Sequence, residues 1–440
     1  MDTNTIIAVV ILVVGITVGI LMGLPVAVAM GLPSTVAIVI LLDWEGAALT
    51  SAQQIFAASN SFALLAIPFF ILAGGLMNTG GIASRLIDLA LVVAGRLPAP
   101  LAQTTVVANA MFGSVSGASV ASAAAVGTVL SPRMRKEGYD PAFSATVNAA
   151  SSPSGMLIPP SNTFIVYSLV AGGGASIGAL FMAGVGPGIL WALICIVMVA
   201  LYARKRPELR ATGPRPTLKQ AVIVFLRAIP ALLMIVVVIG GILSGFFTAT
   251  ESAVIAVLYS LALGLVQRTL SVKDLPKVLL EATKVTGIIM LLIGVSGILG
   301  YVLAFARIPQ LVTQGLLGFT DNTAIILIII MIVLLLAGTV MDPTPAILIF
   351  TPIFLPVVVA LGVSPVHFGA MMVFNMCLGN ISPPIGNNLF VAARVGNVRI
   401  ESVFKGIWPY FWALCIGLLI VAFVPALSMW LPETLGLIRP

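Results

Sequence analysis

The chain has 440 residues, of which 60% are apolar and only 8% are charged. Soluble domains carry about 25% charged residues, so this composition excludes a water-soluble fold and predicts an all-α polytopic membrane protein. The net charge of +7 is typical of basic cytoplasmic loops in a membrane chain, and we expect no nucleic-acid partner.

Eight apolar runs are long enough to span a bilayer, which needs a helix of about 20 residues. They lie at residues 5–22, 24–42, 61–79, 178–202, 223–244, 249–266, 285–306 and 405–430. The charged segments 82–97 and 308–320 are predicted to be interfacial arms.

Four further regions are apolar but interrupted by Gly, Ser, Asn or Pro. They are residues 100–131, 141–172, 322–358 and 365–393. A backbone that breaks at membrane depth is tolerated only inside the protein or beside a cavity. We therefore expect two re-entrant hairpins, at 100–131 and 322–358, and two broken helices, at 141–172 and 365–393.

The basic residues predict the orientation. If both hairpins enter and leave on one side of the membrane, the basic loops share one face. That face carries Arg85, Arg96, Arg133, Arg135, Lys136, the basic residues of 204–219, Arg227, Arg268, Lys273, Lys277, Lys284, Arg394, Arg399 and Lys405. The positive-inside rule makes this face cytoplasmic, so both termini are expected to be extracytoplasmic.

The two halves of the chain are similar to each other. A shift of 224 residues aligns Pro132 with Pro356 and the doublet at 159–160 with the doublet at 383–384. Because each half has an odd number of predicted full crossings, we expect two inverted repeats, at 1–202 and 223–440, joined by a basic cytoplasmic linker at 203–222. Inverted repeats with interrupted helices are typical of secondary transporters, whose binding site lies near the membrane midplane.

The first hairpin turns at residues 113–119, GSVSGAS, where small residues allow hydroxyl and carbonyl oxygens to turn inward. Such oxygens suit a hard cation such as sodium. The alternative is that small residues only permit close helix packing. The break in the facing helix favours the cation site.

That facing helix contains Pro159 and Pro160, so it is expected to stop near Ser152 and restart at Pro160. A helix start inside the membrane favours an anion, for example a carboxylate. The second copy repeats the pattern before Asn387 and Asn388. The alternative is a pair of proline kinks that only shape packing. It is disfavoured because an asparagine side chain without a hydrogen-bond partner is costly inside the membrane.

The second hairpin turns at residues 338–344 and contains Asp342, a carboxylate at membrane depth. Such a residue is by default a functional candidate, and it could help to bind a cation or be protonated. The alternative, which we slightly favour, is a helix N-cap, because Asp followed by Pro matches the cap and first helical position. The single histidine, His367, excludes a multi-histidine metal site, and we expect no cofactor.

Nine motifs in this order resemble the large membrane subunit of TRAP transporters. They are PFF at 68–70, AGGLMN at 73–78, GSVSGAS at 113–119, GYDP at 138–141, IPPS at 158–161, DP at 342–343, TPIFLP at 351–356, PVHFG at 365–369 and PPIG at 383–386. The resemblance covers nearly the whole chain. It implies a bacterial or archaeal inner-membrane protein of the elevator type, which imports dicarboxylates, sialic acid or similar carboxylates with sodium as the coupling ion.

The resemblance also implies partners and sites. The partners are a separate small four-helix membrane subunit and a periplasmic substrate-binding protein. The implied sodium-binding residues are Ser114, Ser116, Gly117, Ser119, Ser151, Ser152 and Gly155 in the first half, and Gly338, Thr339, Asp342, Asn375 and Gly379 in the second. The candidate substrate-binding residues, at the two half-helix starts, are Ser161, Asn162, Asn387 and Asn388.

The residues also leave other functions open to comparison. The nearest alternative is a stand-alone sodium:carboxylate symporter of the same fold. A channel is disfavoured by the inverted, discontinuous repeats, and an intramembrane enzyme by the lack of an embedded catalytic dyad. The sequence has no Walker loop, so it gives no support for nucleotide-driven transport.

Overall fold

The computed structural model describes residues 3–206 and 217–438, and in these two segments it has helices and no strands. The first segment contains α1 (Thr3–Leu21), α2 (Val26–Leu41), α3 (Trp44–Ser59), the 3-10 helix η1 (Phe62–Leu65), α4 (Ala66–Thr79), α5 (Ile82–Ala94), α6 (Pro100–Ser116), α7 (Ser119–Lys136), α8 (Pro141–Ser151), α9 (Ser154–Leu157), α10 (Asn162–Val170) and α11 (Ile177–Arg204). The all-α prediction is confirmed for these residues.

The second segment also consists of long helices, broken helices and paired helices. It contains α12 (Leu218–Leu243), α13 (Ala249–Val266), α14 (Leu275–Phe305), α15 (Ile308–Phe319), α16 (Thr323–Val340), α17 (Pro343–Ala360), α18 (Pro365–Gly379), α19 (Asn387–Gly396), α20 (Ile400–Phe423) and α21 (Ala426–Thr434). Among the described residues, nine helical stretches are long and apolar enough to cross a membrane.

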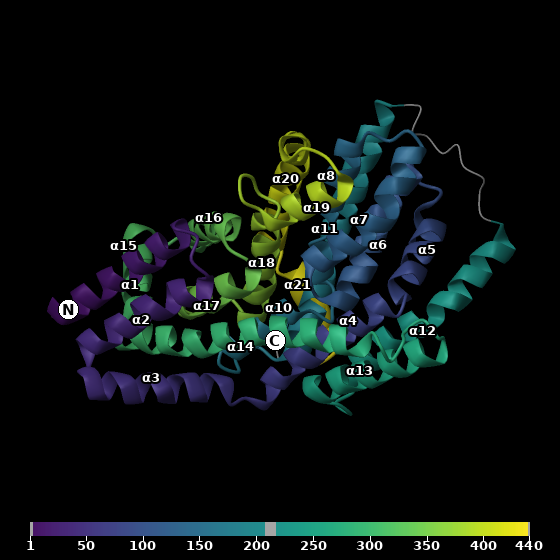
Figure 1. The fold of residues 1–440 in the computed structure, drawn as a ribbon. Coiled ribbons are helices and arrows are strands. Elements are labelled where there is room, and N and C mark those ends of the chain that lie inside the picture. Colours follow the sequence, from purple (N-terminus) through teal and green to yellow (C-terminus); the bar gives the residue numbers. More distant parts are fainter. Residues whose placement is uncertain (1–2, 207–216, 439–440) are drawn as a thin grey trace.

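Long unbroken helices form one side of the molecule. Helix α14 packs against α2, α3 and α4, while α13 packs against α4 and α12. Figure 1 shows α3 and α14 running side by side along this side. Close contact between α1 and α2 depends on small residues, because a Cβ added at Gly15 would lie 2.7 Å from Pro33 Cγ. We call α1–α4 and α12–α14 the scaffold.

The remaining helices pack around the breaks. The hairpin α6–α7 packs against α8 and α9, and the hairpin α16–α17 packs against α18. Helix α19 of the second half packs against α7 and α8 of the first. The two halves of the sequence therefore interlock on this side of the molecule, which we call the core block (α6–α11 and α16–α21).

Hydrogen bonds join the halves inside the core block. The Arg135 guanidinium donates to the Gly396 carbonyl at 2.9 Å, and the Tyr167 hydroxyl donates to the Pro365 carbonyl at 2.7 Å. The first bond ties the end of α7 to the end of α19, so the basic residues near both ends gather at one end of the molecule. We call it the basic end.

Three predicted boundaries are wrong. Helix α14 begins at Leu275 rather than at 285. The prediction began too late because the first turns of this helix carry Lys277, Glu281 and Lys284 and so lack the apolarity of a span. The predicted linker at 203–222 is helical at both ends, since α11 continues to Arg204 and α12 begins at Leu218; residues 207–216 lie outside the described part of the chain.

The last predicted span, 405–430, is also wrong. The structure has two helices there, and α20 ends at Phe423 before α21 begins at Ala426. Pro425 lacks an N–H group and disfavours helical geometry at the preceding Val424. Helix α3, between the second and third predicted spans, was not predicted because its polar residues hide its helical pattern.

Candidate functional site

The first hairpin turns sharply between α6 and α7. Gly117 adopts φ +63° and donates its N–H to the Gly113 carbonyl at 2.8 Å. The turn sits directly against the short helix α9, because a Cβ added at Gly155 would lie 2.1 Å from Gly113 Cα. Only glycine at both positions allows the two backbones to approach this closely.

A buried amide network lies beneath this turn. The Asn109 amide donates to Asn148 Oδ1 at 3.0 Å and to Ser151 Oγ at 2.8 Å. Ser122 Oγ donates to Asn109 Oδ1 at 2.7 Å, and the Asn148 amide donates to the Ala123 carbonyl at 2.7 Å. The network holds both arms of the hairpin against α8. Sequence reasoning missed Asn109 and Ser122, although polar residues within apolar hairpin arms are themselves a signal.

The residues predicted for a first sodium site lie around this turn. All of them are buried except Ser116, which is half-buried and lies with Gly117 at the tip of the turn. The hydroxyls of Ser114, Ser151 and Ser152 donate to backbone carbonyls three or four residues earlier. A hydroxyl that donates its proton in this way keeps its oxygen lone pairs available as acceptors, and Ser151 Oγ already uses one of them for the Asn109 amide.

The facing helix breaks differently from the prediction. Helix α8 ends at Ser151, the four-residue α9 follows, and α10 begins at Asn162 rather than at Pro160. Ser161 occupies the N-cap position, but its hydroxyl donates to the Met156 carbonyl and makes no cap. The chain between the prolines and α10 is extended, so the proline pair ends one helix without starting the next.

The second hairpin repeats the glycine contact. A Cβ added at Gly379, the last residue of α18, would lie 2.5 Å from the Gly338 carbonyl carbon. The Thr339 hydroxyl donates to the Leu336 carbonyl at 2.6 Å. The buried Asn375 amide donates to the Met331 carbonyl at 2.9 Å, and its Oδ1 has no hydrogen-bond partner among the described residues. An unpaired buried oxygen is costly, so this position suits a bound cation.

Asp342 stands at the N-cap position of α17, as the capping interpretation expects, but its side chain makes no capping hydrogen bond. Its Oδ1 instead accepts from the Asn387 amide at 2.7 Å. Both side chains are exposed. The favoured capping role is therefore wrong, and Asp342 joins the second hairpin to the start of α19.

The two neighbouring asparagines at the start of α19 lie differently. Asn387 is exposed and faces Asp342, whereas Asn388 is fully buried. Neither polar atom of the Asn388 side chain has a partner among the described residues. The predicted pair is thus divided between the surface and the interior, and neither residue lines the cavity that both hairpin tips border.

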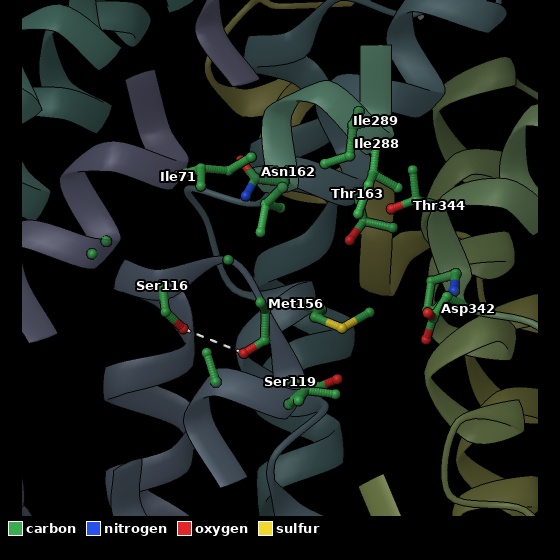
Figure 2. Close-up of a pocket in the computed structure, with 18 of the residues that line it drawn as sticks. Ile71, Ser116, Ser119, Met156, Asn162, Thr163, Ile288, Ile289, Asp342 and Thr344 are labelled. Atoms are coloured by element: carbon green, nitrogen blue, oxygen red, sulfur yellow. Dashed lines mark hydrogen bonds between the residues drawn. The ribbon is translucent and has the colours of Figure 1, made fainter. Parts of the chain in front are cut away.

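A cavity of about 560 Å³ lies where the core block meets the scaffold. Figure 2 shows Ser116 and Ser119 of the first hairpin on one side and Asp342 and Thr344 of the second on the other. The wall also includes Asn162, while scaffold residues of α2, α4 and α14 close the opposite side. Both hairpin tips and one half-helix start therefore border a single cavity.

Asn380, which follows α18, also lines this cavity and was not among the predicted site residues. Its amide donates to Ser119 Oγ at 3.0 Å. This bond joins the break in the second half to the hairpin tip of the first half. The asparagine stands in a run of apolar and small residues, and its polarity there was the available signal.

The charges around the cavity come from helix ends and carboxylates. Three helices begin at its wall: α7 at Ser119, α10 at Asn162 and α17 at Pro343. Each start presents unpaired N–H groups and roughly half a positive charge. Among the described lining residues the charged side chains are Glu281 and Asp342, with no lysine or arginine. An anionic ligand would thus be met by helix starts and amides, beside carboxylates that suit a cation.

The chain is similar to known proteins over nearly its whole length. The family model "Tripartite ATP-independent periplasmic transporter, DctM component" matches residues 13–427. The C4-dicarboxylate TRAP transporter large permease protein DctM of Pseudomonas aeruginosa is 39% identical over 91% of this chain and 93% of its own length. YgiK, an uncharacterized protein of Salmonella typhimurium, is 47% identical over 90% of each chain.

A solved structure shares the fold. The YdaH transporter of Alcanivorax borkumensis, described as having an unusual topology, superposes with a TM-score of 0.64 over 90% of each chain. Its sequence identity to this chain is 14%. The likeness therefore concerns the arrangement of the helices.

Proposed function

The chain belongs to the family of DctM components of tripartite ATP-independent periplasmic (TRAP) transporters, and on this premise we propose that it imports organic acid anions together with sodium ions. As a large membrane subunit of this family it is a multi-pass inner-membrane transport protein and not an enzyme. The substrate class proposed here is a dicarboxylate, sialic acid or a similar carboxylate; the name of the Pseudomonas relative supports the first.

One observation carries the anion proposal: three helices start at the wall of one cavity that has no lysine or arginine among its described lining residues. Helix starts bind carboxylates through backbone N–H groups and the helix dipole. Asn162 and Asn380 add amide donors at the same wall. A carboxylate held in this way would need no basic side chain.

Sodium coupling is supported by oxygen atoms around the two glycine contacts. Hard cations prefer oxygen ligands from carbonyl, carboxylate, amide and hydroxyl groups. The free Oδ1 of Asn375 and the Asp342 carboxylate lie in the second half, and the Ser114 and Ser151 hydroxyls lie in the first. We propose one sodium ion beside each glycine contact, carried as co-substrate.

An elevator movement is supported by the position of the cavity. The hairpin tips and helix breaks lie on the core block, and the opposite wall is formed by unbroken scaffold helices. Hydrogen bonds join the two halves within the core block, as in the pair Asn380 and Ser119. Another joins them on the scaffold side, where the Thr250 hydroxyl of α13 donates to the Phe62 carbonyl at 2.9 Å, and neither bond crosses from the core block to the scaffold. We propose that the core block, built from two inverted repeats, moves as one body against the scaffold.

The family premise extends to partners and orientation. We propose a small membrane subunit and a periplasmic substrate-binding protein as partners, with the basic end of the molecule in the cytoplasm. The contact of Arg135 with Gly396 supports this orientation, because it gathers basic segments of both halves at one end.

A pull-down of the full chain from its native membranes in mild detergent tests the tripartite assembly. We expect mass spectrometry to find a small polytopic membrane protein with it. Reconstituting both with the cognate binding protein in liposomes should then give uptake of a labelled dicarboxylate or sialic acid that needs a sodium gradient. Repeated recovery of the chain alone, with uptake that needs no binding protein, would favour a stand-alone symporter. Uptake equally fast in choline would refute sodium coupling.

A further inference from the structure

A second cavity, of about 660 Å³, lies at the basic end between α8, α11 and α20, away from the hairpin tips. Its volume is within the range of about 300–1,000 Å³ that holds small ligands. Apolar side chains form much of the wall, among them Phe143, Met198, Leu201 and Pro409. The transport proposal makes no use of this space.

The mouth of this cavity is basic. Arg204, Lys205 and the next residue, Arg206, are exposed at the end of α11, and the first two line the cavity. The Arg206 guanidinium lies 5.3 Å from the centre of the Tyr202 ring, within cation–π distance. Among the described lining residues the one carboxylate is Asp140, which already accepts a hydrogen bond from the Ala142 N–H at 2.9 Å. The mouth is therefore suited to an anion.

The interior of the cavity has an aromatic floor. The rings of Phe143 and Tyr202 stack with their centres 3.8 Å apart. Tyr410, on α20, is 4% exposed and lines the cavity, and its hydroxyl has no partner among the described residues. That hydroxyl oxygen is closed off from the cavity space, with less than 1 Å² of accessible surface, so Tyr410 offers a ligand its ring.

The position of the basic mouth along α11 indicates which kind of anion binds there. This helix has 28 residues, is apolar enough to span a membrane, and ends at Arg204. The basic mouth thus lies where a bilayer ends, and the apolar wall lies on the membrane side of it. Basic pockets between membrane helices at this depth bind anionic lipid headgroups.

We propose that this cavity binds an anionic phospholipid, with an acyl chain against the apolar wall and the phosphate at Arg204, Lys205 and Arg206. This proposal does not depend on sodium coupling or on the identity of the transported anion.

The test uses the purified full chain and three probes: phosphatidylglycerol, phosphatidylcholine and glycerol phosphate. Native mass spectrometry of the detergent-solubilised protein measures the retained lipid, and a photoreactive phosphatidylglycerol locates the contact. We expect phosphatidylglycerol to be retained at least tenfold better than phosphatidylcholine. Crosslinked peptides should come from residues 140–146, 198–206 and 402–410.

A triple change, Arg204→Gln, Lys205→Gln and Arg206→Gln, should remove most of this preference, since each cation near an anionic headgroup contributes about fivefold. The matched control replaces three exposed lysines elsewhere and should keep it. These are Lys273, Lys277 and Lys284.

The conservative change Tyr410→Phe keeps the ring and removes the orphan hydroxyl. Because that hydroxyl is closed off from the cavity, both the retention of phosphatidylglycerol and the crosslinking positions should stay unchanged. Equal retention of both phospholipids, equal losses in the triple variant and its control, or crosslinks confined to other helices would overturn the proposal. If glycerol phosphate alone blocked photocrosslinking at the cavity, the ligand would be a soluble anion and the proposal would be overturned.

Discussion

Replacing Gly155 by alanine tests the proposed first sodium site most directly. The added Cβ would lie 2.1 Å from Gly113 Cα, whereas carbon atoms in contact stay about 3.5–4.0 Å apart. The hairpin turn and α9 must therefore separate by roughly 1.5 Å, since Gly113 Cα is a backbone atom and the added Cβ is fixed directly to the backbone of α9. Binding sites hold their ligating groups to within about 0.5 Å, so we expect the variant to lose sodium at this site.

The assay is thermal unfolding of the purified chain in sodium chloride and in choline chloride at equal ionic strength. An ion that binds the folded state stabilises it by about 2.7 kcal/mol at one hundred times its Kd, and by about 0.4 kcal/mol if the Kd rises a hundredfold. With two proposed sites, Gly155→Ala should remove the first contribution and Gly379→Ala the second, whose Cβ would lie 2.5 Å from the Gly338 carbonyl carbon.

The matched control is Gly240→Ala on α12, where an added Cβ meets nothing within 4 Å. It brings the same gain in helix propensity, up to about 1 kcal/mol, and should keep the full sodium effect. Size-exclusion chromatography in choline shows whether each variant is folded, because overpacking alone costs about 1–3 kcal/mol. A folded Gly155→Ala protein with the wild-type sodium effect would refute the reasoning.

Three further changes probe the same region. Asp342→Asn keeps an oxygen that can accept from Asn387 but removes the charge, so sodium-dependent stabilisation should fall while stability in choline stays within about 0.5 kcal/mol; an unchanged sodium effect would exclude the carboxylate as a ligand. Asn380→Ala removes the donor to Ser119 and should cost about 1 kcal/mol and lower uptake in liposomes severalfold, whereas wild-type uptake would show that this link is dispensable. Asn109→Leu leaves several buried partners unpaired at about 1–3 kcal/mol each, so thermal unfolding in choline should show the largest loss of the three; a smaller loss than that of Asn380→Ala would contradict the network.

The interruptions of the apolar runs could be predicted from sequence because Gly, Pro and Asn act locally. Gly117 adopts the positive φ that ends α6. Pro425, which was overlooked in the sequence, ends the last long helix for an equally local reason, its missing N–H group. The composition likewise sufficed for the all-α class. Helix boundaries within charged sequence, such as the start of α14 at Leu275, could not be predicted from apolarity.

Contacts between distant residues lay beyond the sequence pattern. Asn380 meets Ser119 across 261 residues, and nothing local to either residue indicates the partner. The direction of the Asp342 side chain was likewise decided by Asn387, 45 residues away, rather than by its own helix. Residue types suggested which positions are functional, but the partner of each depends on how the two halves interlock.

The interlocked halves have a consequence for biosynthesis. The Ser119 hydroxyl can bond to Asn380 only after 261 more residues have been synthesised, and Arg135 is separated from the Gly396 carbonyl by the same number. At a synthesis rate of about 5–20 residues per second this interval is roughly 10–50 seconds. During that time the first hairpin has left the ribosome without the second-half helices that complete its packing, so the membrane insertion machinery must hold or re-admit it until α18 and α19 arrive.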